Sequence, residues 1–291
     1  MYVYTGTGKS IELNTGGTAV AVDTPFTPWD DVLHRGWHEG VRENTLPAYY
    51  LVAKNGYCWG ECDVRLTADN QIILCHDATI TGTRDGVSVT LTVAESTADE
   101  ITSLVLQTHK TYGDIHPCTL AQLLELAKTV NIGIVIDVKS AGNMMQEAGN
   151  KILAQTVVAS GWADHVVYMP LSINAAKWIQ EIDRNASFDF VSSVYDNNKE
   201  SFISGLSGYQ ALLTGANTVG FDLNAAATGG EEVINAIHNA GLSVSFWGVG
   251  NTSFFPYNPL RVTYNAYSSA HLGRDYIRQQ QSALAAKYPA I

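Results

Sequence analysis

The pattern of apolar and polar positions predicts strands and helices that alternate along most of the chain. Short runs of β-branched and apolar residues predict strands, and apolar residues spaced three and four apart predict helices. Leu120, Leu123, Leu124 and Ala127 fall on one helical face, and residues 132–138 are apolar on both faces, as in a buried parallel strand. Repeated alternation of this kind is typical of a parallel α/β sheet.

The alternation favours a TIM (β/α)8 barrel of the α/β class. An open doubly wound sheet is the alternative, but no glycine-rich phosphate-binding motif follows any predicted strand. We expect eight strands, at residues 32–35, 58–66, 71–75, 132–138, 165–169, 188–193, 218–223 and 243–249. We expect a helix that begins at Asn44 or Thr45 and ends at Asn55, and further helices at residues 120–130, 143–160, 174–183, 231–240 and 272–287.

Two segments depart from this alternation. Residues 78–118 are rich in threonine, aspartate and glycine, so we expect an insertion after strand three, over the face where the strands end. Residues 1–30 contain short strand patterns at 2–4 and 18–22. We therefore divide the chain into an N-terminal β-rich extension, residues 1–30, and a barrel domain, residues 31–291.

Composition narrows the classes of partner. The chain has 291 residues, 46% of them hydrophobic, which is enough for a substantial core. Its net charge of −11 argues against binding to nucleic acid or to anionic membranes. No apolar run is long enough to span a membrane, and the first residues lack the features of a signal peptide. The compartment, cytoplasmic or extracellular, stays open, as does the oligomeric state.

Cysteine usage does not indicate a disulfide framework. The chain has four cysteines, at positions 58, 62, 75 and 118. Strand alternation turns Cys62 and Cys75 away from the polar groups beside them, toward the helices. We expect buried free thiols.

Polar and charged residues gather at the predicted ends of the first four strands. His34 and His76 end strands one and three, and Glu61 and Asp63 lie two apart on strand two, so these two carboxylates face the same way. Asp137 ends strand four. In an α/β barrel the carboxyl ends of neighbouring strands meet at one face, where active sites form. We expect these side chains to converge.

The residue types in this set suit metal-assisted cleavage of a phosphodiester. Three convergent carboxylates repel one another unless a cation binds, and oxygen ligands favour Mg²⁺ or Ca²⁺. Two histidines can take a proton from the nucleophile and donate one to the leaving oxygen. Arg35 and Lys139 suit the remaining phosphate oxygens.

The ordered motifs of residues 31–250 resemble the glycerophosphodiester phosphodiesterase family. They are His34-Arg35-Gly36, Glu43-Asn44-Thr45, Glu61-x-Asp63-Val64, Thr67-x-Asp69, His76-Asp77 and Asp137-x-Lys139. The resemblance implies a TIM barrel that hydrolyses small glycerophosphodiesters to glycerol 3-phosphate and an alcohol, with one Mg²⁺ or Ca²⁺ ion. It implies that His34 and His76 are the acid and base, and that Glu61, Asp63 and Asp137 are metal ligands. Arg35, Lys139 and Trp247 would bind phosphate or substrate, with Glu43, Asn44 and Asp77 supporting them.

The sequence also departs from the family pattern. Asp137 stands where the family usually has glutamate, a difference shared with sphingomyelinase D-like phospholipases. Residues 36–43 form an enlarged segment, and residues 257–269 lack the family's glycine-rich, aspartate-containing last strand motif. Two alternatives are therefore kept: a sphingomyelinase D-like phospholipase, and a non-catalytic barrel used as a binding module.

Overall fold

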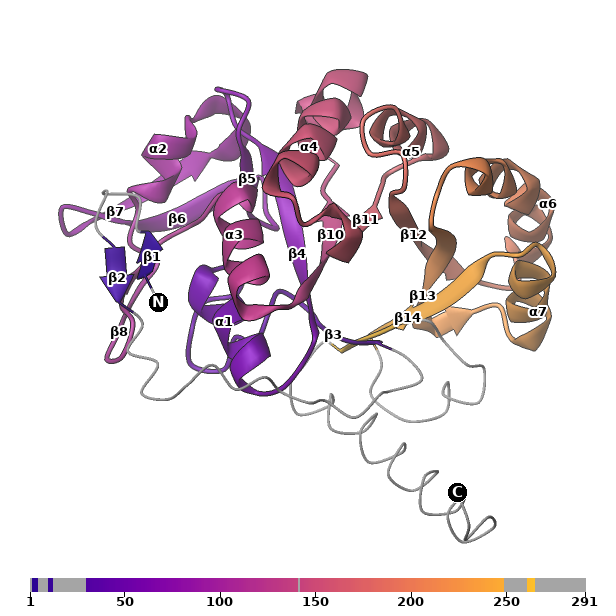
Figure 1. The fold of residues 1–291 in the computed structure, drawn as a ribbon, viewed down its shortest axis with the longest axis horizontal. Coiled ribbons are helices and arrows are strands. Elements are labelled where there is room, and N and C mark those ends of the chain that lie inside the picture. The colour runs from indigo at the N-terminus through magenta and orange to yellow at the C-terminus, as the bar shows by residue number, and fades with distance from the viewer. Residues whose placement is uncertain (1, 5–9, 13–29, 141, 249–260, 265–291) are drawn as a thin grey trace, which may run out of the picture.

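The computed structural model describes residues 2–4, 10–12, 30–140, 142–248 and 261–264. Figure 1 shows these residues as one body in which helices pack around a curved sheet. The predicted strand at 18–22 and the predicted helix at 272–287 lie outside the described residues.

Eight parallel strands form the centre of the molecule. Each strand pairs with two parallel neighbours, and the ring closes through pairing of the last strand with the first. This is a TIM-barrel-like α/β fold, as predicted. In ring order the strands are β3 (Asp30–Leu33), β4 (Trp59–Leu66), β10 (Gly133–Val138), β11 (Val166–Met169), β12 (Ser187–Val194), β13 (Thr218–Thr228), β14 (Ser243–Trp247) and β15 (Arg261–Tyr264).

Helices connect most of these strands and cover the outside of the ring (Figure 1). They are α1 (Leu46–Lys54), α3 (Leu120–Val130), α4 (Glu147–Ser160), α5 (Ile173–Gln180), α6 (Lys199–Gln210) and α7 (Glu231–Asn239), with 3₁₀ turns at Gly142–Met145, Ala163–His165 and Ala211–Thr214. Local sequence sets their ends: Thr119 and Gln122 form a capping box at the start of α3, and Asn131 ends it in the left-handed conformation. Five of the helices were predicted within a few residues, whereas α6 was not predicted.

The predicted third strand is not part of the ring. β5 (Ile72–Leu74) pairs antiparallel with β4. The connection of residues 67–71 is too short for a parallel crossover, which needs a dozen or more residues. The ring strand that follows β4 is therefore β10. The strand predicted as the eighth, β14, is the seventh strand of the ring, and β15, which was not predicted, is the eighth.

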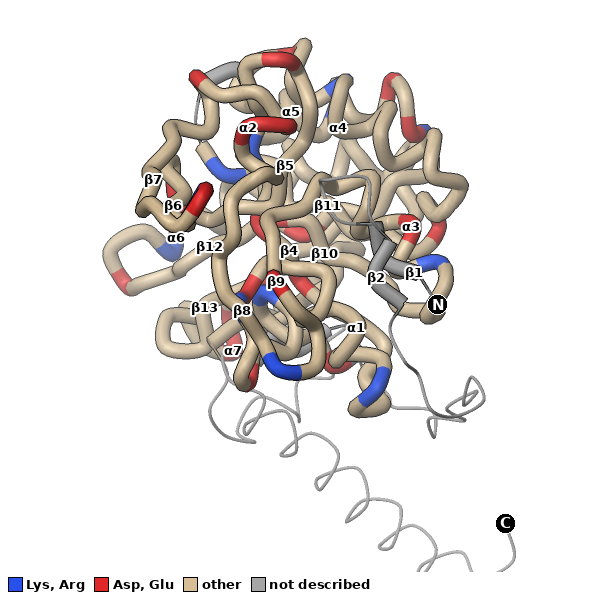
Figure 2. The backbone as a smooth tube through the Cα atoms, turned by 90° about the vertical axis from the view of Figure 1, so that its left-hand side faces the viewer, with Lys and Arg blue, Asp and Glu red and all other residues tan. Residues whose placement is uncertain are grey.

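The segment between β5 and α3 is a small unit with its own elements and core. It consists of the hairpin β6 (Thr79–Arg84) and β7 (Val87–Thr92), a 3₁₀ turn at Val93–Glu95, helix α2 (Ala98–Thr102), and the hairpin β8 (Gln107–His109) and β9 (Gly113–Ile115). Ile73, Cys75, Val93 and Ile101 form its buried core. We call residues 72–118, which include β5, the excursion; it lies on the left in Figure 1 and toward the viewer in Figure 2.

The described part of the N-terminal extension is an antiparallel pair of strands. β1 (Tyr2–Tyr4) pairs with β2 (Ser10–Glu12), and neither pairs with the barrel sheet. Tyr2–Tyr4 was predicted to be a strand.

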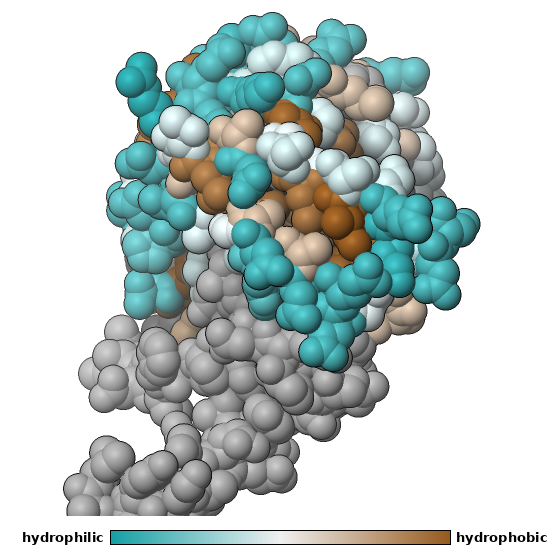
Figure 3. All heavy atoms as spheres, turned by 90° about the vertical axis from the view of Figure 1, so that its right-hand side faces the viewer, coloured by the Kyte–Doolittle hydropathy of each residue, from teal (hydrophilic) through white to brown (hydrophobic). Residues whose placement is uncertain are grey.

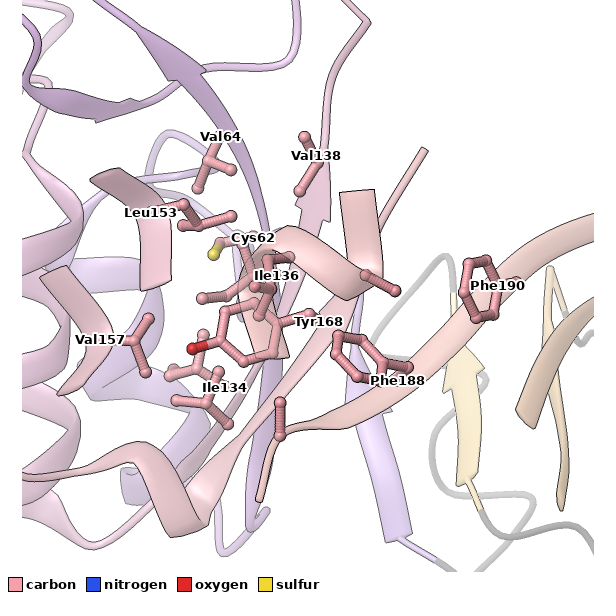
Figure 4. Packing of buried hydrophobic residues seen from close by; sticks show 14 of the residues in the cluster. Cys62, Val64, Ile134, Ile136, Val138, Leu153, Val157, Tyr168, Phe188 and Phe190 are labelled. Carbon is pink, nitrogen blue, oxygen red and sulfur yellow. The ribbon is translucent and has the colours of Figure 1, made fainter. Parts of the chain in front are cut away.

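Side chains alternate between two cores across the ring strands. Ile134, Ile136 and Val138 of β10 face outward, toward Leu153 and Val157 of α4 (Figure 4). The residues between them face the inside of the barrel, where Val32, Val135 and Val167 pack against Trp59. This alternation turns Glu61, Asp63 and Asp137 inward, because each lies an even number of positions along its strand from Trp59 or Val135, which face the inside of the barrel.

The four cysteines are free thiols. Cys62, Cys75 and Cys118 are buried, and Cys62 packs in the outer core, away from the inside of the barrel, as predicted. Cys58 is exposed, so the prediction that all four thiols are buried is wrong for this one. It precedes β4 and lies in the connection from α1, outside the sheet core.

The surface is mixed in polarity and poor in charge. Figure 3 shows apolar side chains between polar ones on the side that carries α6 and α7, and in Figure 2 lysines and arginines are scattered along the chain. Among the described residues, no helix has the length and apolar character needed to cross a bilayer.

The close approach of β4 and β10 inside the barrel requires glycine at position 133. A Cβ atom built there would lie 2.4 Å from Cε3 of Trp59. We expect Gly133→Ala to lower the free energy of unfolding by about 1–3 kcal/mol through overpacking. Chemical denaturation measures the change.

The matched control is Gly205→Ala in α6, where nothing lies within 4 Å of the added atom. This change should leave the free energy of unfolding unaltered or raise it by up to about 1 kcal/mol. Equal stability of both variants would contradict the close packing of Trp59.

Candidate active site

One cavity at the carboxyl ends of the ring strands collects the predicted polar groups. Its volume is about 310 Å³. Its lining is His34, Arg35, Glu61, His76, Asp137, Lys139, Met169, Val191, Asp222 and Trp247. The side chains expected to converge therefore line one cavity. His76, however, follows the antiparallel strand β5 and not a strand of the ring.

Three carboxylates form the acidic centre of this site. One oxygen each of Glu61, Asp63 and Asp137 lies within 4.8 Å of the others. Glu61 and Asp63 are almost completely buried, with 3% and 0% exposure. Burial, and then repulsion by Asp63 and Asp137, raises the pKa of Glu61 well above its usual range. Burial also raises the pKa of Asp137, although Lys139 opposes the shift.

Asp63 is the most heavily engaged of the three. Its Oδ2 accepts a hydrogen bond from Nδ2 of Asn44 at 2.7 Å and contacts Nε of Arg35 at 3.0 Å. Its Oδ1 contacts Nζ of Lys139 at 2.8 Å. A fully buried carboxylate with partners on both oxygens is held in one orientation, because any rotation would leave a charged oxygen unpaired.

Both predicted phosphate-binding cations contact carboxylates at the cavity wall. Nζ of Lys139 lies between Asp63 and Asp137, 2.5 Å from Oδ2 of Asp137. Nη1 of Arg35 donates a hydrogen bond to Glu43 at 2.8 Å. Burial lowers the pKa of Lys139, but the neighbouring carboxylates Asp137 and Asp63 outweigh it and raise the pKa above its ordinary value.

The loop after β3 is shaped by residues in the left-handed conformation. Arg35 and Asn44 have φ of 57° and 54°, and the backbone N–H of Asn44 donates to the carbonyl of Arg35 at 3.2 Å. The backbone N–H of Arg35 donates to Oε2 of Glu61 at 2.8 Å. Oδ1 of Asn44 accepts from the backbone N–H of Asp63 at 3.2 Å and lies 3.0 Å from the hydroxyl of Tyr49. This loop thus positions both carboxylates of β4.

The two histidines lie in different environments. Nε2 of His34 is 3.9 Å from Oε2 of Glu61, and burial, with the charge of Arg35, lowers the pKa of His34 to about 4. His76 is more exposed, and its Nδ1 lies 2.8 Å from Oδ1 of Asp77. Nε and Nη2 of Arg65 both donate to the carbonyl of His76. His34 is therefore uncharged at neutral pH, and His76 is held in place from β4.

The far wall of the cavity was only partly predicted. Trp247 lines it, as expected, but Met169, Val191 and Asp222 were not singled out. Met169 ends β11, Val191 lies in β12 and Asp222 in β13, all on predicted strands. Met169 and Val191 are apolar and suggest no chemistry, so their position near strand ends was the available signal. Asp222 could also have been noticed as an acidic residue within an otherwise apolar predicted strand. His38, His109, His116, His165 and His238 do not line the cavity.

Residues 34–279 match the sequence profile of the glycerophosphoryl diester phosphodiesterase family. The chain belongs to this family. The family was recognised correctly from the motifs at the strand ends.

Curated relatives are similar over short stretches. The probable glycerophosphodiester phosphodiesterase 1 of Mycobacterium tuberculosis is 42% identical over 66 residues, which are 22% of this chain and 24% of the relative. Human glycerophosphodiester phosphodiesterase 1 is 31% identical over 125 residues, 42% of this chain and 37% of the human protein. The chain therefore spans about a quarter to two fifths of the length of these relatives.

Solved structures are similar over most of the chain. A putative glycerophosphoryl diester phosphodiesterase from Silicibacter pomeroyi superposes with a TM-score of 0.69 at 18% identity, covering 86% of this chain and 94% of that one. A phosphodiesterase from Oleispira antarctica, solved in complex with the product sn-glycerol-3-phosphate, gives 0.62 at 15% identity and covers 84% and 96%. These likenesses show the fold.

We expect Asn44→Ala to destabilise the protein because it removes the amide partner of a buried carboxylate. The lost hydrogen bond to Asp63 and the left-handed backbone at position 44 should together lower the free energy of unfolding by about 2–4 kcal/mol. Denaturant unfolding of Asn55→Ala is the control, since Asn55 is exposed, has a negative φ, and its side-chain amide donates to the carbonyl of Leu51, one turn earlier. Similar losses in the two variants would contradict the role given to Asn44.

Proposed function

We propose that this protein hydrolyses small glycerophosphodiesters to glycerol 3-phosphate and an alcohol, with the help of one divalent cation. The observation that carries the proposal is a single cavity lined by two histidines, two cations and acidic ligands. Family membership supports the reaction class, and the related fold from Oleispira antarctica binds the product glycerol 3-phosphate.

The acidic centre fits a divalent cation. Oε1 of Glu61 is buried and has no hydrogen-bond partner among the described residues, which is costly for a carboxylate oxygen unless it is protonated or bound to a cation. The four carboxylates Glu43, Glu61, Asp63 and Asp137 face two cations, Arg35 and Lys139, leaving two negative charges in excess when all are ionised.

Glu61, Asp63 and Asp137 are the residues that would hold the ion. Carboxylate oxygens suit Mg²⁺ or Ca²⁺ rather than zinc. A bound cation would polarise a phosphoryl oxygen and offset charge that develops there.

The histidines divide the proton transfers. A neutral imidazole can accept a proton, so His34 suits the base that activates the attacking hydroxyl or water. Asp77 engages Nδ1 of His76, which leaves Nε2 as the ring nitrogen that meets the substrate and suits it to protonate the leaving oxygen. Both side chains line the same cavity.

The cations retain hydrogens with which to bind phosphate. Lys139 has three ammonium hydrogens, and its contacts to Asp63 and Asp137 account for two. Arg35 has five N–H groups; its hydrogen bond to Glu43 uses one Nη1 hydrogen, and its Nε lies 3.0 Å from Asp63 in an ion pair. The carboxylates thus orient both cations without using all their donors.

The domain division is also proposed. The pairing of β1 and β2 with each other, and not with the ring, supports the N-terminal residues as an extension. The ring supports residues 31–291 as the catalytic domain, although Asp30, assigned to the extension of residues 1–30, already belongs to the ring strand β3. A non-catalytic barrel would not need to preserve two histidines, three carboxylates and two cations around one cavity, so we favour the enzyme.

The test is hydrolysis of glycerophosphocholine, glycerophosphoethanolamine and glycerophosphoglycerol, followed as release of glycerol 3-phosphate. We expect turnover that EDTA stops and that Mg²⁺ or Ca²⁺ restores. His34→Ala and His76→Ala should each lower kcat by about 10²–10⁴-fold, the usual contribution of a positioned acid or base.

The matched control is His238→Ala, because His238 is exposed on α7 and lies outside the cavity. Circular dichroism should show that all three variants are folded. Near-normal activity in either cavity variant, or no turnover of any diester by folded, metal-loaded protein, would refute the proposal.

Cation binding should tighten as the pH rises and should release protons. The raised pKa of Glu61 means that, without a cation, the site retains a proton at pH values above the ordinary glutamate pKa of about 4.3. In the cation-free protein this shift stabilises the fold at low pH, and the stabilisation is lost as the pH rises through the folded pKa. Calorimetry with Ca²⁺ in buffers of different ionisation enthalpy measures the released protons.

Glu61→Gln should lower the proton release and lose most of the affinity, since an amide cannot ionise. Glu125→Gln, an exposed change on α3, should behave like the unmodified protein. An affinity that does not depend on pH would contradict this account of Glu61.

A further inference from the structure

The enlarged segment of residues 36–43, in the loop after β3, packs against the excursion. Val41 lies in this segment, outside any helix or strand, yet it is only 6% exposed. It belongs to one buried cluster with Ala48 of α1 and with Tyr112 and Ile115 of the hairpin β8–β9. Two parts of the sequence that depart from the barrel pattern therefore meet each other.

The hairpin supplies contacts that the loop after β3 does not make through its own backbone. Among the described residues, no backbone N–H of residues 39–43 donates a hydrogen bond to another backbone carbonyl. Nε2 of Gln107, on β8, instead donates to the carbonyl of Gly40 at 2.9 Å. A loop without regular backbone hydrogen bonds keeps one conformation through such tertiary contacts.

The hairpin depends on the same contact. Among the described strands, β8 and β9 pair only with each other, and a two-stranded hairpin alone is at best marginally stable. Tyr112 and Ile115 belong to the cluster with Val41 and not to the core of the excursion around Ile73 and Ile101. The hairpin is therefore packed against the loop after β3.

This loop carries the partner of a cation that lines the cavity. Glu43 follows Val41 by two residues, and its Oε1 accepts a hydrogen bond from Nη1 of Arg35 at 2.8 Å. Nε of Arg35 lies 3.0 Å from Oδ2 of Asp63. Two carboxylates thus fix the plane of the guanidinium, and of these only Glu43 belongs to the segment that the hairpin contacts.

We propose that the hairpin β8–β9 is a positioning element of the active site: it holds the loop after β3 so that Glu43 keeps the guanidinium of Arg35 directed at the phosphate of the substrate. Gln107 and Tyr112 are then positioning residues, since neither lines the cavity. The proposal rests on the proposed function, because a phosphodiester is what Arg35 would bind. It gives the excursion a second role, beside that of carrying His76.

The double variant Gln107→Ala, Tyr112→Ala tests the proposal. Without the hairpin contact, Arg35 should be aligned in only part of the population, and the apparent affinity for substrate falls by that fraction. We expect KM for glycerophosphocholine, measured by choline release, to rise about tenfold, with less than about threefold change in kcat. The inhibition constant of added glycerol 3-phosphate should rise by the same factor, because its phosphate uses the same guanidinium.

Calcium affinity separates the positioning of Arg35 from damage to the whole site. Glu61 and Asp63 lie on β4 and Asp137 lies on β10, and the hairpin pairs with neither strand. We therefore expect the Kd for Ca²⁺, measured by calorimetry, to change by less than about twofold in the double variant. A loss of Ca²⁺ affinity as large as the rise in KM would contradict the proposal.

A double-mutant cycle tests whether the hairpin acts through Glu43. Glu43→Ala alone should raise KM about tenfold, and adding the two hairpin substitutions should raise it by less than about twofold more, because the contact they act through is already lost. Fully additive effects would contradict this route.

The matched control is Tyr209→Ala, Gln210→Ala on α6, outside the cavity lining. Nε2 of Gln210 donates to the carbonyl of Ala240 at 2.8 Å, a hydrogen bond of the same kind as the one lost in the hairpin. Tyr209 packs edge-on against Phe190 and Phe221, with ring centroids 4.7 Å apart in both pairs. The control variant should lose stability and keep the KM of the intact protein.

Gln107→Ala alone leaves the apolar cluster intact and covers the case in which the double variant does not fold. It should raise KM about threefold, whereas Gln210→Ala should not change it. An unchanged KM in the folded hairpin variants, or an equal rise in the controls, would overturn the inference and leave the proposed function standing. No turnover of any diester by the folded, metal-loaded intact protein would instead remove the proposed function, and the inference with it.

Discussion

The buried carboxylate of Asp63 is the interaction on which the site depends. It has no exposed surface, and its partners come from three places: Arg35 and Asn44 in the loop after β3, and Lys139 just beyond β10. An unpaired charge in such a position would cost several kcal/mol, so the folded chain must bring all three partners together. Assembly of the ring and assembly of the site are therefore one event.

The same constraint explains the unusual backbone around the site. Arg35 and Asn44 adopt the left-handed conformation, which costs about 1–2 kcal/mol for a residue with a side chain. Asn44 meets that cost by contacting Asp63 through both its amide nitrogen and its amide oxygen. Glu61 is positioned by the same loop, since the backbone N–H of Arg35 donates to it. The left-handed backbone thus occurs in the loop that orients the carboxylates of Glu61 and Asp63.

Much of this arrangement could be predicted from the sequence because it follows from strand periodicity. Glu61 and Asp63 had to share a face, and the regular helix spacing of residues 120–130 marked α3 correctly. The pairing direction of β5 was not recognised, because a run of apolar residues carries no information about direction. The absence of a predicted helix between β4 and β5 was the sign that these two strands are not joined by a parallel crossover.

Helix α6 was not predicted because its apolar pattern is weaker, with only Leu206 fully buried. β15 was missed because it has only four residues, which is short for a recognisable strand pattern. Met169 and Val191 of the far wall were missed because they resemble ordinary core residues.

Because β5 pairs antiparallel and lies outside the ring, the two imidazoles come from different parts of the fold. His34 follows a ring strand, whereas His76 belongs to the excursion, which has its own small core and is tied to the ring through the pairing of β5 with β4 and the contact of Arg65. The hairpins and α2 beyond residue 78 add no strand to the ring. Insertions or deletions among them can therefore accumulate while the carboxylates stay in place. Evolution can reshape the approach to one imidazole without rebuilding the barrel that holds the other.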